Sequence, residues 1–513
     1  MTGRAGAVLR LVGVALLTLT ALTWHTRSAR GATPSAYMAG QGESFPEQAV
    51  MQLERDAGNA NVIGGLTPTY LAGNALGEEG ALGNFAQGQA DFAVTGQPLN
   101  SAEMATAASS HITPAYVPYA TGAVAIVAAV TVRNQAGTVG LLQGLKLKMS
   151  TLAKIYTGQI TSWKDAEIFT ENPGLTYELN HVVEQPPTID PVARQDSTAT
   201  NSAFFAAIRA NSKASAAFGP TIPATGQPAD RFPSTGIGTP VTGGSAAVAQ
   251  HMRHIDPSTG IPSNQPASSI GYVSIAWAQQ YSIPLVAMEN LAGNYVAADA
   301  GSIGSAMSSG ATFDPSTNLY SISKTFDYSA MTDPAAYPIP LPDYLVVPQT
   351  GDTAPKENAV AGFVNFALGS TGQQDVTANG MVPPNSSVAA AGKAVASAMI
   401  AAATTTTSTT TSTTSNTSTT STSVTPTSTA AQGSSTTSTT AGGVATTTTS
   451  TGNRAVAAAA SNGGSSASSN PRSSSGAQLP STGGSAAALG AFGVGAIVAG
   501  DLVRQRARRR RRP

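Results

Sequence analysis

Apolar residues recur along the chain with two different spacings up to about residue 390, and this pattern predicts alternating strands and helices. The continuous run 123–130 (AVAIVAAV) has the length and composition of one buried strand. Residues 46–56 carry apolar side chains at helical spacing behind a proline, which the first turn of a helix accepts. Short apolar runs that alternate with helices are typical of parallel sheets covered by helices. We therefore predict an α/β fold, and roughly 350 residues are enough for two lobes.

Residues 191–205 (PVARQDSTATNSAFF) combine one basic side chain with several small hydroxyl residues. Arg194 is followed by Thr198 and Thr200, and a helical pattern begins directly afterwards. A strand end, a turn and a new helix leave several backbone N–H groups unpaired near one point, where a guanidinium and hydroxyls add further donors. The stretch therefore indicates an anion site. The alternative is an ordinary Ser/Thr helix cap beside a surface arginine.

Composition narrows the possible partners. The 513 residues include no cysteine, which excludes disulfides, cysteine-ligated metal and a lipid-modified cysteine anchor. The chain is formally neutral, but its basic residues are concentrated at the two ends. Residues 32–400 contain 14 Lys and Arg against 26 Asp and Glu, a net charge of −12. This acidic balance argues against nucleic acid as a partner, and any bound anion has to be held by local donors.

Signals for catalysis are poor. The chain has no Gly-x-Ser-x-Gly elbow, Walker loop or dinucleotide fingerprint. His251 and His254 could lie on one helix face, but no third ligand is near them in the sequence, so we do not predict a metal site. Tyr156 and Trp163 have the spacing of core residues. We therefore predict a binding protein without a cofactor, and not an enzyme.

The first 31 residues have the order of a secretory signal peptide. Arg4 and Arg10 precede and flank an apolar stretch, residues 11–22, and the small residues Ala29 and Gly31 follow. The protein is therefore expected to be exported. An uncleaved membrane anchor is the alternative, although the apolar stretch is short for a membrane span.

Residues 401–478 differ from everything before them. Long Thr and Ser runs dominate, and there is no charged residue between positions 404 and 453. Such a segment cannot bury enough apolar surface to offset the loss of chain entropy. We predict a disordered stalk that is open to O-glycosylation.

The C-terminal segment, residues 479–513, has three elements in order: a Leu-Pro-x-Thr-Gly pentapeptide, a weakly apolar stretch and an arginine-rich end. The pentapeptide consists of Leu479, Pro480, Ser481, Thr482 and Gly483. This order is similar to a sortase sorting signal. The resemblance implies that a sortase cleaves between Thr482 and Gly483 and attaches the protein to the cell wall of a Gram-positive bacterium. A single-span membrane anchor is the alternative.

Several stretches in unbroken order between about residues 37 and 390 resemble the periplasmic phosphate-binding proteins of ABC transporters. The first is the Arg-x-Asp-x-Ser/Thr-x-Thr pattern that begins at Arg194. The others are residues 42–46 (GESFP), 91–99 (DFAVTGQPL), 152–163 with 172–174 (NPG), and 270–273 (IGYV).

The resemblance implies a type 2 periplasmic-binding-protein fold over residues 37–395. Lobe I would contain about 37–116 and 279–395, and lobe II about 117–278. The ligand would lie in the cleft between the lobes, and the two crossing segments would act as a hinge. A permease of the ABC transporter is the implied membrane partner.

The resemblance also implies a set of ligand-binding positions. They are Ser44, Phe45, Arg194, Thr198, Ala199 and Thr200. Thr198 keeps the hydroxyl of the family's serine, whereas Ala199 in place of glycine offers only its backbone N–H.

Two further ligand positions depart from the family. Glu79 brings a carboxylate where the family has a serine, and Gly96 replaces the aspartate that accepts a hydrogen from protonated phosphate. Either Glu79 is protonated or turned to accept the ligand's hydrogen, or it pairs with Arg194 and fills the pocket itself. The second arrangement is favoured because Arg194 has no other obvious partner in an empty cleft.

We expect a cell-surface solute-binding protein that holds phosphate or another small oxyanion between its lobes. The alternative is a degenerate binding domain, reused as a wall-anchored adhesin or structural module without tight phosphate binding. A wall tether favours the alternative, because a carrier of solutes has to reach a membrane permease.

Overall fold

The computed structural model describes residues 37–72, 77–221, 232, 238–256, 260, 263 and 265–414. The expected signal peptide (1–31), the sorting signal (479–513) and all of the expected stalk after residue 414 lie outside the described residues. Those three assignments therefore remain predictions.

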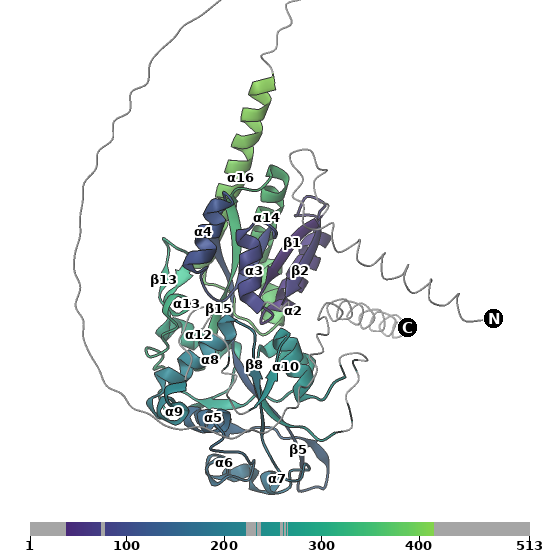
Figure 1. Cartoon of the computed structure of the whole chain (residues 1–513), viewed down its shortest axis with the longest axis vertical. Helices are drawn as coiled ribbons and strands as arrows, with labels where there is room; N and C mark the ends of the chain where they lie inside the picture. Colours follow the sequence, from purple (N-terminus) through teal and green to yellow (C-terminus); the bar gives the residue numbers. More distant parts are fainter. Residues whose placement is uncertain are drawn as a thin grey trace, which may run out of the picture. The chain divides into compact units, whose positions relative to one another are not determined.

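Sheet A has five strands in the order β2-β1-β3-β15-β4. The strands are β1 (Tyr37–Gly42), β2 (Thr67–Ala72), β3 (Phe92–Thr95), β4 (Thr113–Ala123) and β15 (Pro340–Thr350). β1 is parallel to β2 and β3, whereas β15 is antiparallel to β3 and β4. Helices α2 (Glu47–Asn59), α3 (Gly77–Ala86), α4 (Ser101–Ser109) and α14 (Ala354–Ala367) pack on this sheet (Figure 1).

Sheet B has five strands in the order β6-β5-β10-β8-β9. The strands are β5 (Ala125–Arg133), β6 (Val139–Leu141), β8 (Asp190–Arg194), β9 (Thr239–Val241) and β10 (Ser268–Val273). Helix α10 (Gly244–Met252) packs on β8, β9 and β10 (Figure 1). β8 is parallel to both of its neighbours, and β5 is antiparallel to β10. The predicted α/β fold is confirmed, but both sheets are mixed and not purely parallel.

The remaining elements connect or flank the two sheets. The strands are β7 (Lys146–Leu147), β11 (Ala287–Glu289), β12 (Tyr295–Val296), β13 (Phe313–Asp314) and β14 (Leu319–Tyr320). The helices are α5 (Met149–Tyr156), α6 (Ala166–Glu171), α7 (Thr176–Asn180), α8 (Ala199–Ala210), α9 (Ser212–Phe218), α11 (Ile275–Gln280), α12 (Ala300–Gly310), α13 (Ser321–Thr325) and α15 (Ser370–Ala378), with short 3₁₀ turns at Pro173–Leu175 and Gly219–Thr221.

The chain crosses from sheet A to sheet B at Val124, not at residue 116. β4 pairs with β15 along its whole length, so the expected boundary falls inside one strand. The return crossing is also later than residue 278, because Pro284 and Val286 form backbone hydrogen bonds with β5, and β11 and β12 form a three-stranded sheet with β7. An apolar run does not reveal which sheet it joins. We call residues 37–123 and 297–414 the sheet A half, and residues 125–296 the sheet B half.

Helix α16 (Ser386–Thr414) extends both the domain and its core beyond the expected boundary. Val395, Met399 and Ala403 are buried, so the domain does not end at residue 395. The first fourteen residues of the expected stalk continue this helix, which runs from an alanine-rich stretch with high helix propensity into the first Thr and Ser residues of the stalk. Among the described residues, only Ser386–Thr404 of this helix is long and apolar enough to cross a membrane, by length and composition alone. One face of this stretch, with Val395, Met399 and Ala403, is buried against the domain.

An aromatic cluster fixes the start of α8 against sheet B. The ring of Phe204 stacks on that of Tyr272, with 4.5 Å between the centroids. The Tyr156 hydroxyl donates to the backbone oxygen of Val192 on β8 at 3.0 Å. Trp163 is also buried and donates to Ser268 on β10. Tyr156 and Trp163 are core residues, as expected, and they hold the β8–α8 turn rigidly in place.

Candidate functional site

The C-terminal ends of β1, β3 and β8 meet the first turns of α3, α8 and α10 between the two sheets. Glu43 and Ser44 follow β1, Gly96 follows β3, and Arg194 is the last residue of β8. Thr198 caps α8, and its hydroxyl accepts the backbone N–H of Thr200. Helix N-termini and strand ends of this kind present several N–H donors to one region.

Arg194 is buried, with 1% of its surface exposed, and its guanidinium is held by neighbouring side chains. It forms a two-point ion pair with Asp196, and its Nε lies 3.1 Å from Oδ1 of that carboxylate. It also donates to the hydroxyls of Ser44 and Ser245, each at 3.3 Å. The predicted ion pair between Arg194 and Glu79 is therefore wrong. Arg194 pairs with Asp196, because alternate residues of an extended segment lie on the same side.

Burial alone would lower the pKa of the Arg194 guanidinium. The charge of Asp196, its hydrogen bonds and the charge of Glu43 outweigh burial and raise that pKa above its usual value. Arg194 is thus permanently charged. The amide of Asn201 donates to the backbone oxygens of Arg194 and Asp196, and this keeps the turn in shape.

One carboxylate oxygen of Glu43 receives three donors from the β8–α8 turn. The Thr198 hydroxyl donates to Oε1 at 2.5 Å, and the backbone N–H of Thr200 donates to it at 3.1 Å. The Thr200 hydroxyl donates to the same oxygen. Burial raises the pKa of Glu43, while the charge of Arg194 and the bonds from both threonines act in the opposite direction. Burial is the larger effect, so the pKa of Glu43 is raised overall, and the three donors are directed at one oxygen of its carboxyl group.

A second carboxylate, Glu78, binds the neighbouring donors. The backbone N–H of Ala199 donates to its Oε2 at 2.5 Å, and the N–H of Gly96 donates to Oε1 at 3.2 Å. The Thr95 hydroxyl donates to the same Oε1. The backbone N–H of Glu78 in turn donates to the oxygen of Ser197 at 3.1 Å.

The sequence analysis expected the carboxylate of Glu79 at a ligand position, whereas in the structure the carboxylate that accepts the N–H groups of Gly96 and Ala199 is that of Glu78. Glu78 is 1% exposed, whereas the next residue, Glu79, is only partly buried. One residue along a helix turns a side chain by about 100°, so the two glutamates face different surroundings. Gly77 precedes them with a φ of +68°, and a Cβ there would lie 2.8 Å from the Ser197 oxygen. A glycine is therefore needed for α3 to approach the turn.

Gly96 faces Ala199 across the site. A Cβ added at Gly96 would lie 2.8 Å from the Cβ of Ala199 and 2.8 Å from Cδ1 of Leu341. The family's aspartate is therefore missing at this position, and this arrangement has no space for its side chain.

Ser44 and Phe45 have different surroundings. The Ser44 hydroxyl accepts the backbone N–H of Ser245 at 2.9 Å, and its backbone oxygen accepts the indole N–H of Trp277 at 3.0 Å. The ring of Phe45 packs against Gly122 in the core of the sheet A half. Ser44 therefore lies in the site with the other hydroxyls, and the Phe45 side chain lies behind it.

Asp343 on β15 adds a fourth buried carboxyl group, after Glu43, Glu78 and Asp196. Its pKa is raised well above the usual value by burial, and the charges of Glu43 and Glu78 raise it further. Within the described part of the chain, both of its oxygens, Oε2 of Glu43 and the Tyr119 hydroxyl lack a hydrogen-bond partner. The described residues contain no group of three or more His, Cys, Asp or Glu arranged to hold a metal ion.

Sequence reasoning missed several residues of the site. They are Glu43, Glu78, Asp196, Ser245 and Asp343. Glu43 stood within the quoted stretch 42–46, and the glycine pair before Ser245 is a signal for a helix start.

His251 bonds to Asp190, with 2.9 Å between Nε2 and Oδ2. That histidine is part of sheet B packing.

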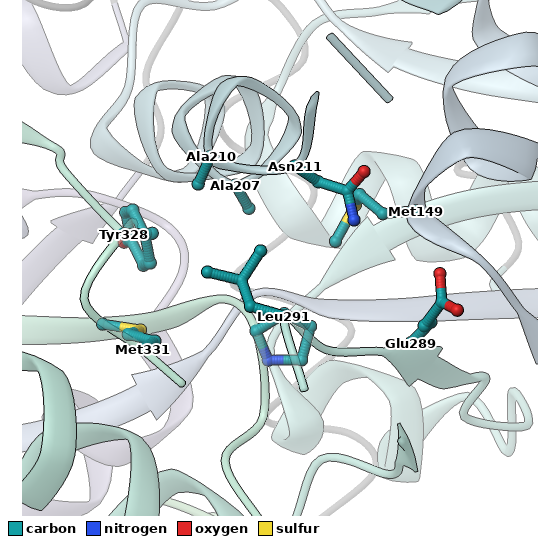
Figure 2. A pocket seen from close by; sticks show the side chains of 9 residues that line it. Met149, Ala207, Ala210, Asn211, Glu289, Leu291, Tyr328 and Met331 are labelled. Carbon is teal, nitrogen blue, oxygen red and sulfur yellow. The ribbon is translucent and has the colours of Figure 1, made fainter. Parts of the chain in front are cut away.

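A shallow hollow at the other end of α8 shares no residue with the site. Figure 2 shows Ala207 and Ala210 of that helix beside Leu291 and Tyr328. The distance from Ala199 to Ala210 along the helix axis is about 16 Å. The hollow therefore does not extend the candidate site.

Comparison with known proteins shows the family. Residues 28–371 match the model of the PBP superfamily domain, which is more than half of the chain. The chain therefore belongs to the PBP superfamily. Phosphate-binding protein PstS of Xylella fastidiosa strain Temecula1 is 25% identical over 358 residues, covering 68% of this chain and 82% of that protein. Phosphate-binding protein PstS2 of Mycobacterium bovis BCG is 26% identical over 392 residues, covering 74% and 94%.

The solved structures that this chain matches include a phosphate-binding protein from Stenotrophomonas maltophilia. The TM-score is 0.48 at 16% identity, and the match covers 71% of this chain and 94% of that one. Another is a putative phosphate ABC transporter substrate-binding protein with bound phosphate from Clostridium perfringens. Its TM-score is 0.42 at 13% identity, with 68% and 100% covered.

Proposed function

We propose that this protein is an exported solute-binding protein whose site between the two sheets holds a small oxyanion such as phosphate. One observation carries the proposal: Thr198 and Thr200 direct three donors at a single carboxylate oxygen beside the buried Arg194. Carboxylate and phosphate oxygens accept the same kinds of hydrogen bond. The names of the relatives, which describe phosphate-binding proteins, agree with this chemistry.

The proposed ligand-binding residues follow the sequence expectation with one shift. They are Ser44, Phe45 (through its backbone), Gly96, Arg194, Thr198, Ala199 and Thr200, and Glu78 takes the place of Glu79 as the carboxylate beside them. Asp196 already offsets the charge of Arg194, so the neutral donors carry much of the recognition.

A second candidate function is a wall-displayed adhesin or structural module without tight phosphate binding. The specific observation in its favour is that Glu43 and Glu78 already accept the hydrogen bonds of the donors. An anion in this site would meet two carboxylates at short range, and like charges repel strongly in a buried site.

Nuclear magnetic resonance tests the oxyanion site even when binding is weak. We expect phosphate, added to residues 37–414, to shift the backbone amide signals of Gly96, Ala199 and Thr200. Chloride at matched ionic strength is the control. Equal shifts with chloride, or no shift at these three amides, would contradict an oxyanion site. A Thr200→Val variant should show a weaker response, because it loses the Thr200 hydroxyl, one of the three donors, and keeps the backbone N–H.

Export and anchoring are the second part of the proposal. The order of elements in residues 479–513 supports cleavage by a sortase between Thr482 and Gly483. An ABC transporter permease is the proposed recipient of the solute, and a wall-tethered domain would need a long stalk to reach it.

A further inference from the structure

We propose that Glu43 and Glu78 form an internal ligand that occupies the anion donors, holds the two halves of the domain closed without solute, and competes with any incoming oxyanion. We call these two residues the carboxylate pair. The inference rests on the proposed function, because it takes the donors of the β8–α8 turn to be ligand donors.

The carboxylate pair and its donors at the β8–α8 turn belong to different halves of the domain, whereas the Gly96 donor lies in the same half as the pair. Glu43 follows β1 and Glu78 opens α3, both in the sheet A half. Thr198, Ala199 and Thr200 belong to the sheet B half, and their bonds to the pair join residues more than 100 positions apart. These bonds therefore cross the space between the sheets, as bonds through a bound ligand would.

The pair satisfies the donors as an external anion would. Glu43 takes both threonine hydroxyls and the Thr200 N–H, and Glu78 takes the Ala199 and Gly96 N–H groups. Both glutamates are 1% exposed. The same donors cannot bind phosphate at full strength until the carboxylates leave. Solute and carboxylate pair therefore exclude each other.

The closed arrangement of the two halves, held by the carboxylate pair, is reversible. Oε2 of Glu43 and both oxygens of Asp343 have no hydrogen-bond partner among the described residues, and unsatisfied buried polar groups are costly. The one buried arginine of the site is already bonded to Asp196. Separation of the halves as rigid bodies would expose these groups to water and withdraw the pair from its donors together. The pair is thus a removable ligand.

The pair also sets which oxyanion the site accepts. An ionised carboxylate about 4 Å from a bound anion lowers affinity by roughly a thousandfold per unit charge, at an effective dielectric constant of about 20. Gly96 provides no side-chain acceptor for a protonated ligand. A doubly charged anion therefore has to displace both carboxylates, and a singly charged or weakly charged oxyanion is favoured over it.

Small-angle X-ray scattering of residues 37–414 tests the internal ligand directly. This segment carries a continuous hydrophobic core from Met38 to Met399. The wild-type protein should have the same radius of gyration with and without phosphate. The variant with Glu43→Gln and Glu78→Gln, which keeps the shape of both side chains, should be larger without phosphate and contract when phosphate is added. We expect its affinity for phosphate to rise by about tenfold or more.

Glu167→Gln is the matched control, because Glu167 is an exposed partner of Lys154 in the sheet B half. It should behave as the wild type does. A wild-type protein that contracts on adding phosphate would overturn the inference, as would a double variant that stays compact without phosphate. The wild-type result does not depend on whether a variant folds. A double variant that expands but never binds phosphate would support the internal ligand and contradict the proposed oxyanion function.

Discussion

The carboxylate of Glu43 accepts the backbone N–H of Thr200 at 3.1 Å, although the two residues belong to different halves of the domain. Thr200 lies in the first turn of α8, where backbone donors have no partner within the helix. A negative group from the other half supplies that partner. This contact joins the closure of the domain to the occupation of its anion site, and the predictions below follow from it.

The site can be rebuilt toward the family pattern, but three substitutions are needed. Glu78→Ser removes a carboxylate, and Gly96→Asp restores the acceptor for protonated phosphate. Ala199→Gly removes the Cβ that would lie 2.8 Å from a Cβ at position 96, and the flexible side chain of Leu341, whose Cδ1 would lie equally close, has to turn aside. We expect the triple variant to bind phosphate more tightly than the wild type in calorimetric titrations. The variant with Glu78→Ser and Gly96→Asp alone should gain much less, and equal gains would show that the steric argument is wrong.

Replacement of Arg194 by alanine should destabilise the domain as well as weaken anion binding. The change leaves the buried carboxylate of Asp196 without its cation, and the loss of one partner of a buried pair typically costs about 3–5 kcal/mol. Urea unfolding measures this cost. The double variant Arg194→Ala with Asp196→Ala is the control, and it should recover part of the stability. A double variant that is less stable than the single one would contradict the pairing.

The stability of the domain should fall as the pH rises through neutrality. Burial raises the pKa of Glu54 to about 8, whereas the same group in an unfolded chain ionises near its usual value of 4.5. Between these two values the folded protein binds more protons than the unfolded protein, so the free energy of unfolding decreases with rising pH. One such group contributes at most about 1.4 kcal/mol per pH unit.

Glu54→Gln isolates this contribution. Urea unfolding at pH 5 and pH 8 should show a smaller loss of stability in the variant than in the wild type. Burial also raises the pKa of Glu47 to about 7, so the stability of the variant should still decrease somewhat with rising pH. The same pH dependence in both proteins would show that Glu54 is ionised in the folded state.

Thr482→Ala tests the proposed sorting signal in cells. A sortase that cleaves between Thr482 and Gly483 would no longer act, so the protein should move from the covalent cell-wall fraction to the membrane or the medium. Ser481→Ala is a suitable control, because the pattern leaves that position open. Variant protein that persists in the covalent wall fraction would exclude this route of attachment.

Local features of the site could be predicted from sequence. The strand that ends at Arg194, the cap at Thr198 and the helix behind it follow from neighbouring residues, and the structure has all three. The pairing of Arg194 with Asp196 was also within reach, because it joins residues two positions apart. The expected pairing with Glu79 overlooked the fact that alternate side chains of an extended segment lie on the same side.

Long-range features could not be predicted in the same way. The bonds of Glu43 and Glu78 reach residues 121 to 157 positions away, and no periodicity in the sequence reports such contacts. Whether Glu78 or Glu79 faces the site depended on the rotation of about 100° between successive side chains of a helix. The crossing at Val124 was hidden because the apolar run around it continues without a break from one sheet into the other.

Calorimetric titration of residues 37–414 with phosphate near neutral pH tests the central claim most directly. The claim is that the chain's own carboxylates, Glu43 and Glu78, hold the anion donors. The wild-type domain should therefore show no micromolar affinity for phosphate, and the variant with Glu43→Gln and Glu78→Gln should bind more tightly. Micromolar binding by the wild-type domain, unchanged in that variant, would contradict the account.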